Sequence, residues 1–128
     1  LDAFPCSFPY ESYESKVNSA EIIFIGTVLE GKYVQAKASD DEVYEDYIEV
    51  KVQVNRVIKG KLSPKITTIR TSADNCRINF SVLGTYVIFK PKNINYVYLS
   101  DGTSEINRLH ENTIAEEIKG MLKKSSTN

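Results

Sequence analysis

Apolar and polar residues alternate along the stretch Ile48-Glu49-Val50-Lys51-Val52-Gln53-Val54-Asn55. Successive side chains of an extended chain point to opposite faces, so a period of two separates an apolar face from a polar one. The stretch is therefore predicted to be a half-buried β-strand with a core on one side and solvent on the other. The alternation ends at residues 56–58, and Lys59-Gly60-Lys61 is predicted to form the turn that follows.

Four other segments are rich in β-branched and aromatic residues and are predicted to be strands, at residues 21–29, 66–71, 85–90 and 96–100. The first of them contains Gly26, and a glycine inside a strand often marks a bend or a bulge. Residues 31–46 are polar and largely acidic, and they are predicted to form a long hairpin loop. The chain is therefore expected to be mainly β.

Helical periodicity is present at both ends of the chain. Before the first strand, apolar or aromatic residues recur at steps of three or four, at Tyr10, Tyr13, Val17 and Ala20. This spacing is typical of a short amphipathic helix. A second helix is predicted over residues 112–124, where Thr113 and Glu116 have the spacing of a capping box. Its apolar face is expected to consist of Ile114, Ile118, Met121 and Leu122.

Five strands with a helix before and a helix after them predict a five-stranded antiparallel Greek-key barrel of the OB type, with both helices packed on it. The length of 128 residues favours one domain over residues 1–128. Hydrophobic residues make up 41% and charged residues 26%, which is ordinary for a globular protein. Apolar runs such as residues 22–25 are four residues long, whereas a membrane helix needs about twenty, so no membrane partner is expected.

The charge balance and the cysteine count restrict the function further. The formal net charge is -1, whereas a protein that neutralises several phosphates usually has an excess of basic residues. The cysteines, Cys6 and Cys76, are 70 residues apart, which does not fit a CxxC metal or redox site. They are either free thiols or one long-range disulfide. Residues 1–5 lack the basic start and the apolar core of a signal peptide, so these residues leave the compartment open.

Motifs of known catalytic chemistry are absent from the sequence. There is no G-x-S-x-G, no G-x-G-x-x-G, no P-loop and no clustered Cys/His set that offers zinc ligands. The one histidine, His110, is expected to lie at the surface or at a helix cap. We therefore expect no enzyme activity, no cofactor and no metal ligands in this chain.

Two charged clusters have alternative interpretations. Acidic residues at Asp40, Asp41, Glu42 and Glu45 could ligate calcium, but they lack EF-hand spacing, so a solvated hairpin tip is favoured. Basic residues at Arg56, Lys59, Lys61 and Lys65 could contact nucleic acid, as in many OB barrels. That mode also needs aromatic stacking platforms, and core packing explains the aromatic residues Tyr86, Phe89, Tyr96 and Tyr98 about as well.

Several stretches resemble one family when they are taken in order. Cys6-Ser7-Phe8-Pro9, followed by a helix and then Ala20-Glu21-Ile22-Ile23-Phe24-Ile25-Gly26-Thr27-Val28, resembles the opening of netrin-like (NTR) domains. Val50-Lys51-Val52-Gln53-Val54-Asn55-Arg56-Val57-Ile58-Lys59-Gly60 resembles the second strand of these domains, with its closing turn. Cys76, Phe80, Gly84-Thr85-Tyr86-Val87-Ile88-Phe89 and Tyr98-Leu99-Ser100 follow in the family's order. The chain is similar to the tissue inhibitors of metalloproteinases (TIMPs), in a short form with a single domain.

The resemblance implies an OB-type barrel, a secreted or other extracytoplasmic location, and a disulfide between Cys6 and Cys76. It also implies a protein-binding ridge made of Cys6, Ser7, Phe8, Pro9, Asp74 and Asn75. The family's second N-terminal cysteine falls at Phe8, and the usual partner of that cysteine falls near Ser100. Both members of this second disulfide are therefore missing together.

In inhibitors of this family the first cysteine is the N-terminal residue, and its α-amine and carbonyl chelate the zinc of the protease. By this resemblance Cys6 would be the chelating residue and Ser7 the residue that enters the specificity pocket. Here Leu1-Asp2-Ala3-Phe4-Pro5 precede Cys6 as an N-terminal extension, so its nitrogen is an amide with a delocalised lone pair that binds zinc poorly.

The expected function is therefore that of a monomeric, non-enzymatic protein-binding domain whose partner is a protein, with metalloproteases as the candidate class. Zinc chelation is not expected of the chain as it stands. The alternative is an OB-fold module that binds nucleic acid or glycan on a barrel face.

Overall fold

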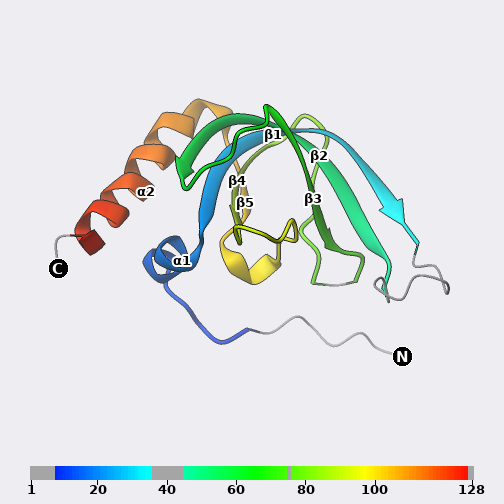
Figure 1. The fold of residues 1–128 in the computed structure, drawn as a ribbon, viewed down its shortest axis with the longest axis horizontal. Helices are drawn as coiled ribbons and strands as arrows, with labels where there is room; N and C mark the ends of the chain where they lie inside the picture. The colour runs from blue at the N-terminus through cyan, green and yellow to red at the C-terminus, as the bar shows by residue number, and fades with distance from the viewer. Residues whose placement is uncertain (1–7, 36–44, 75, 127–128) are drawn as a thin grey trace.

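One curved antiparallel sheet forms the centre of the fold (Figure 1). The computed structural model describes residues 8–35, 45–74 and 76–126. Within these residues the strands are β1 (Ile22–Val34), β2 (Tyr47–Lys59), β3 (Ile66–Ser72), β4 (Thr85–Lys90) and β5 (Ser104–Ile106). The helices are α1 (Tyr13–Ser19) and α2 (Glu111–Ser126), with short 3-10 turns at η1 (Leu99–Asp101) and η2 (Arg108–His110). The predicted mainly-β class with a helix at each end is confirmed.

Apolar residues on the two faces of the sheet enter two separate cores. The alternation predicted in β2 is confirmed, because Val50 and Val52 are buried whereas Lys51 and Gln53 are exposed. The inner face of the sheet packs around Ile22, Phe24, Val28, Val50, Val52, Ile69, Ile78, Tyr86, Ile88 and Val97. The outer face packs against the helices through Val17, Ile23, Ile25, Val87, Phe89, Ala115 and Ile118. Strand β4 contributes to both cores, and all six of its residues are buried.

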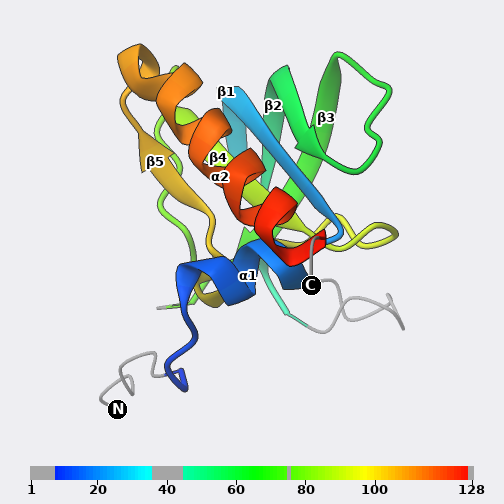
Figure 2. The ribbon, with the colours of Figure 1, turned by 90° about the vertical axis from the view of Figure 1, so that its left-hand side faces the viewer.

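The two helices cover the outer face of β1 and β4, with α2 running across these strands (Figure 2). Helix α1 begins after Ser12, whose side chain accepts a hydrogen bond from the Ser15 backbone N–H (3.1 Å). At its other end, Lys59 Nζ of β2 donates to the carbonyls of Val17 and Asn18, at 3.0 Å each. A lysine ammonium at the C-terminus of a helix stabilises the free carbonyls there. Lys59 thereby attaches α1 to the sheet.

The bend predicted at Gly26 coincides with an irregularity in the β1–β2 pairing. Ile25 is paired with Arg56 and Gly26 with Val54, so β2 carries one extra residue at this point. Similar shifts lie between Ile23 and Phe24 and between Val28 and Glu30. Bulges of this kind increase local twist and bend the strand. They account for the strong curvature of β1 and β2 (Figure 1).

The predicted loop over residues 31–46 is wrong at its beginning, whereas residues 45 and 46 lie outside any strand as predicted. Strand β1 continues to Val34 and pairs with the beginning of β2, with Val34 opposite Tyr47. Ion pairs across the two strands join Lys32 to Glu49 (3.6 Å) and Lys51 to Glu30 (3.4 Å). Composition alone indicated a loop, whereas cross-strand pairing favours extended chain here. The acidic residues Asp40, Asp41 and Glu42 lie outside the described residues.

The predicted strand at residues 96–100 is also wrong, and β5 lies further along the chain. Asp101 accepts hydrogen bonds from the backbone N–H groups of Tyr98 and Thr103, at 2.8 Å each. Gly102 follows with a φ of 109°, a conformation that favours glycine. This arrangement folds the chain into η1 and turns it back, so that Ser104–Ile106 pairs with β4 as strand β5. The strand prediction for residues 96–100 rested on their β-rich composition, which gives no information about the capping by Asp101.

The C-terminal helix is confirmed, but its predicted capping box is wrong. Helix α2 begins at Glu111 rather than beside Thr113 and continues directly from η2. The cap lies earlier, because the Asn107 side chain accepts a hydrogen bond from the Leu109 N–H (2.9 Å). In the described residues, neither helix is both long and apolar enough to cross a membrane.

The closed barrel predicted from the sequence is not confirmed, because the sheet is open. Its order is β3-β2-β1-β4-β5, which places β3 and β5 at the edges. Residues 95–97 lie against part of the free edge of β3, through one parallel bridge between Arg70 and Tyr96. Two backbone hydrogen bonds hold this contact, from Arg70 N to Asn95 O (2.7 Å) and from Val97 N to Arg70 O (2.8 Å).

Leu83 is the one described residue other than glycine with a positive φ, at 69°. It lies in a tight turn in which the Gly84 N–H donates to Ser81 O (2.9 Å), and its side chain is 75% exposed. A left-handed conformation costs an ordinary L-residue about 1–2 kcal/mol, and asparagine tolerates it better. Leu83→Asn is therefore expected to raise the free energy of unfolding by about 0.5–1 kcal/mol in urea titrations. The same change at Val82, which is 60% exposed and has no positive φ, should have little effect. A loss of stability in Leu83→Asn would contradict this account.

Candidate functional site

The predicted ridge is only partly within the described residues. Cys6, Ser7 and Asn75 lie outside them, so the pairing of Cys6 with Cys76 stays a prediction. Phe8 and Pro9 are exposed and precede α1, and Asp74 is exposed in the loop after β3. The described part of the predicted ridge is therefore Phe8 and Pro9 at one end and Asp74 at the other.

Phe8 and Pro9 lie beside the segment that carries η1. Together with Ser100 they line a shallow hollow of about 660 Å³, whose other walls are Tyr10, Glu11 and Lys16. Phe8 is 45% exposed and Tyr10 is 93% exposed, so both rings are available to a partner. Phe8 and Ser100, which are far apart in the sequence, thus come to one place on the surface.

Asp74 shapes the loop at the other end of the ridge. Its Oδ1 accepts hydrogen bonds from Ser72 Oγ (2.7 Å) and from the Cys76 N–H (2.8 Å). These bonds, led by that from Ser72, lower the pKa of Asp74 below its ordinary value, so the carboxylate is charged at neutral pH. The Arg77 guanidinium also donates to the carbonyls of Ala73 and Asp74 (3.4 and 3.2 Å). The loop therefore presents a fixed negative charge.

Two tyrosines lie in the segment between the bridge at Arg70 and η1. The rings of Tyr96 and Tyr98 are 4.9 Å apart, and Tyr98 is 51% exposed. Burial raises the pKa of Tyr96, and the nearby Tyr98 and the charge of Asp74 add to this effect. Val97 between them points the opposite way and is fully buried. The tyrosine pair thus lies between the bridge to β3 and Ser100, which lines the Phe8 hollow.

Core packing was one explanation of the aromatic residues, and it holds for only some of them. Tyr86 and Phe89 are buried, with 1% and 0% of their surface exposed, whereas Tyr98 is half exposed. The alternation Tyr96-Val97-Tyr98 could have indicated this from the sequence, because it places both tyrosines on the side opposite a buried valine. We define the end surface as Phe8, Pro9, Asp74, Tyr96, Tyr98 and Ser100.

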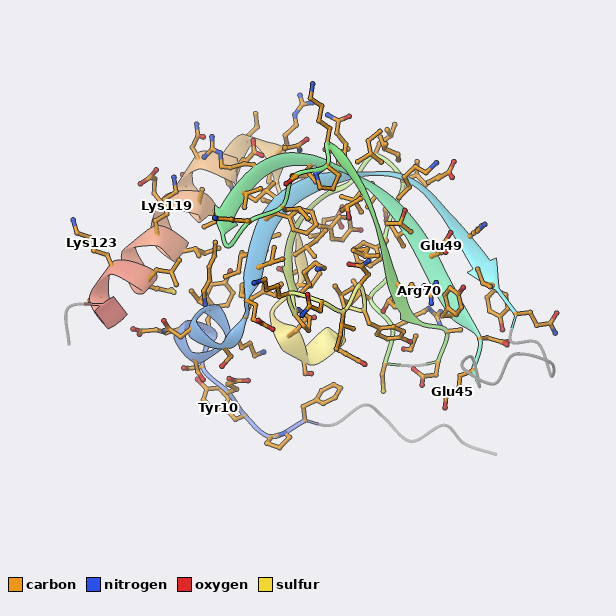
Figure 3. The ribbon with its side chains drawn as sticks, viewed as in Figure 1. Tyr10, Glu45, Glu49, Arg70, Lys119 and Lys123 are labelled. Atoms are coloured by element: carbon orange, nitrogen blue, oxygen red, sulfur yellow. The ribbon has the colours of Figure 1, made fainter. Side chains whose placement is uncertain are left out.

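Figure 3 shows how side chains near the N-terminal segment, on β2 and β3 and on α2 are arranged. Tyr10, at the end of the N-terminal segment, and Glu45, before β2, project from the same lower side of the molecule. Arg70 and Glu49 lie on neighbouring strands near Glu45, whereas Lys119 and Lys123 project from α2 at the opposite end. The Arg70 guanidinium lies over the Tyr47 ring, 4.4 Å from its centre.

Asp101 holds the Tyr98 backbone in place and is itself largely removed from solvent. Burial raises the pKa of its carboxyl above the ordinary value of 3.8, although the hydrogen bonds from Tyr98 and Thr103 oppose the shift. The folded chain therefore binds this proton more tightly than the unfolded chain does. The stability that protonation provides is fully present below pH 3.8 and is lost as the pH rises through the higher pKa of the folded state.

Asp101→Asn, which cannot titrate, is the variant that isolates this effect. The free energy of unfolding of the natural chain, relative to the variant, is expected to fall as the pH rises from about 4 to about 7. Asp74→Asn is the matched control, because the pKa of Asp74 is shifted in the opposite direction, below 3.8. The charged Asp74 therefore stabilises the fold above pH 3.8, and this stabilisation is lost only as the pH falls below that value. Urea titrations at several pH values measure both differences. A relative stability of the natural chain over Asp101→Asn that increases toward neutral pH would contradict the assignment.

The basic cluster proposed for nucleic acid is partly used inside the fold. Lys59 holds the end of α1, and Arg56 donates to the Asn112 side chain of α2 at 2.6 Å. Lys61 and Lys65 are exposed. Two of the four predicted contact residues therefore serve to attach the helices to β2.

In the described part of the chain, no three or more His, Cys, Asp or Glu side chains are grouped so as to hold a metal ion. His110 lies exposed at the end of η2. Comparison with known proteins gives no assignment, because no protein-family model matches the chain and no curated protein matches it significantly. The arrangement offers exposed aromatic rings and one fixed carboxylate, which are suited to contact with another protein.

Proposed function

We propose that this chain is an extracytoplasmic, non-enzymatic protein-binding domain of the netrin/TIMP type, which uses the end surface to contact its partner. The observation that carries the proposal is the shared hollow of Phe8 and Ser100. The resemblance requires these two positions to be adjacent, because it assigns to them the two halves of a missing disulfide. Residues separated so far in the sequence have no local reason to meet.

Other observations support the OB-type barrel that belongs to this proposal. Residues 95–97 run parallel to β3 and bond to it at Arg70, while the inner core joins Val97 to Ile69 of β3 and Ile88 of β4. The proposed barrel would be closed along this contact between residues 95–97 and β3. The proposed disulfide would connect the N-terminal segment to the loop beside Asp74 and would fit an oxidising, extracytoplasmic compartment.

Metalloproteases are the proposed partner class. Phe8 and Tyr98 are the proposed anchors, since half-exposed aromatic side chains supply much of the energy of protein interfaces. Cys6 would bind a catalytic zinc well only with a free α-amine, which a chain that begins at Cys6 possesses. The chain that begins at Leu1 is expected to bind without strong chelation.

Binding to a panel of metalloprotease catalytic domains, each with its active site free or blocked by a small inhibitor, tests this proposal. Phe8→Ala and Tyr98→Ala are each expected to weaken binding at least about tenfold, a loss typical of a buried anchor. Leu109→Ala is the matched control, because Leu109 is 84% exposed but lies in η2, beyond the opposite end of β4. Two results would contradict the proposal. One is binding that is as tight in Phe8→Ala and Tyr98→Ala as in the natural chain, and the other is binding that is unchanged when the active site is blocked.

The alternative function, nucleic-acid binding, predicts a different salt dependence. The proposal expects weak binding or none to a single-stranded oligonucleotide at both low and high salt. Tight binding that declines steeply as salt is raised would show that phosphates are neutralised. Such a result would favour the alternative and would overturn the protein-binding proposal.

A further inference from the structure

Among the described residues, no strand pairs with the outer edge of β3 over Ile66–Thr68. In the β2–β3 ladder the Arg70 backbone faces outward, because its N–H donates to Asn95 O and its carbonyl accepts from Val97 N. Backbone groups of alternate residues in a strand face the same side, so those of Thr68 and Ile66 face outward as well. The Lys65 carbonyl confirms the alternation, since it bonds inward to Val54 N at 2.7 Å.

The chain that covers Arg70 moves away from β3 before it reaches Thr68. Within the described residues the bridge between Arg70 and Tyr96 has no continuation toward Ile66. A hollow of about 430 Å³ opens at this point, lined by Glu49, Thr68, Arg70, Asn93, Ile94, Asn95 and Tyr96. The free edge of β3 is therefore accessible from the surface.

Exposed apolar side chains flank this edge. Ile66 on β3 is 51% exposed, and Ile94 across the hollow is 55% exposed. Thr68 lies between Ile66 and Arg70 on the same outer face, so the edge presents two β-branched side chains in register. Proteins usually protect such edges with charge, proline or a covering segment, because another extended chain pairs with them readily.

We infer that this edge binds an extended peptide segment of a partner protein by β-strand addition, at Ile66–Thr68. Another extended backbone can pair with the outward N–H and C=O groups of these residues in alternation and replace the water bound to them. The outward side chains favour β-branched or aromatic residues at alternate positions of the incoming segment, without proline. The edge meets the end surface at Tyr96, but the inference rests on the backbone of Ile66 and Thr68 and does not depend on the function proposed above.

Proline at position 68 isolates the backbone contribution. The Thr68 N–H faces outward, so Thr68→Pro removes a donor from the free edge without breaking a bond to β2. Thr68→Val keeps the N–H and the branched shape and is the matched control. The probe is a synthetic peptide with the sequence of residues 48–55, which alternates apolar and polar side chains.

Addition of this peptide at about 1 mM is expected to slow amide hydrogen exchange at Thr68 and Ile66 at least tenfold. The protection should persist in Thr68→Val and be lost in Thr68→Pro, where Ile66 reports it because proline has no amide hydrogen to exchange. A peptide N-methylated at alternate amides tests the same contact without altering the protein, should Thr68→Pro fail to fold, and it is expected to give no protection. The inference is overturned if the peptide gives no protection. It is also overturned if the N-methylated peptide protects equally, or if the changes map to Phe8 and Ser100 instead.

Discussion

A Gly26→Ala variant is expected to lose about 3 kcal/mol of its free energy of unfolding, because the added methyl group has no room. A Cβ at this position would lie 2.4 Å from Val52 Cγ1 and 2.8 Å from the Gln53 carbonyl oxygen. The valine is fully buried, and the carbonyl belongs to the backbone of β2 at the bulge. Neither neighbour can move without disturbing the β1–β2 pairing. Urea or thermal unfolding of the purified variant measures the loss.

Gly120→Ala provides the control for this prediction. Gly120 lies inside α2, and a Cβ there would meet nothing within 4 Å. Alanine is a better helix former than glycine, so this variant is expected to gain about 1 kcal/mol. The same chemical change should thus have opposite signs at the two positions. Equal effects, or a stable Gly26→Ala variant, would show that β1 and β2 are not as closely packed at the bulge as described.

The proposed disulfide predicts a large and non-additive loss of stability. A cross-link between Cys6 and Cys76 would close a loop of about 70 residues, which on the chain-entropy estimate contributes about 4 kcal/mol. Cys6→Ser and Cys76→Ser are each expected to lose about this amount, a large share of the stability of a small domain. The double variant should lose no more than either single variant, because each change already breaks the same bond.

The alternative of two free thiols predicts a different pattern. Small losses that add in the double variant would indicate independent cysteines. A reducing agent should destabilise the natural chain as much as either substitution does and should leave the variants unchanged. If the reducing agent has no effect on the natural chain, the disulfide must be abandoned, and with it the argument for an oxidising compartment.

Local patterns predicted the parts of the fold that depend on neighbouring residues. The alternation around Val50 and Val52 and the bend at Gly26 were both readable from the sequence, because strand period and glycine geometry are local. The position of β5 was not readable. It depends on Asp101 capping two backbone N–H groups and on the left-handed Gly102, whereas the preceding tyrosines have strand propensity. In this segment the side-chain hydrogen bonds of Asp101 outweighed the strand propensity of the preceding residues.

The candidate site was predictable only in fragments. Phe8 and Pro9 came from the resemblance, and no pattern of spacing places Phe8 in one hollow with Ser100. For Tyr98 the sequence left core packing and a surface role open, because composition does not show on which side of the chain an aromatic ring lies. The sequence also did not predict the role of Lys59. Its position beside a turn does not show that its ammonium group will bond to the C-terminal end of α1. Such contacts depend on the tertiary arrangement of β2 and α1.

The most direct test of the central claim is the inhibition of metalloproteases by two forms of the protein, the chain that begins at Leu1 and one trimmed to begin at Cys6. If the end surface is a TIMP-like ridge, both forms are expected to bind the same protease. The trimmed form is expected to inhibit at least about tenfold more strongly, because its free α-amine can bind zinc. If neither form binds or inhibits any protease of the panel, the inhibitor proposal is contradicted.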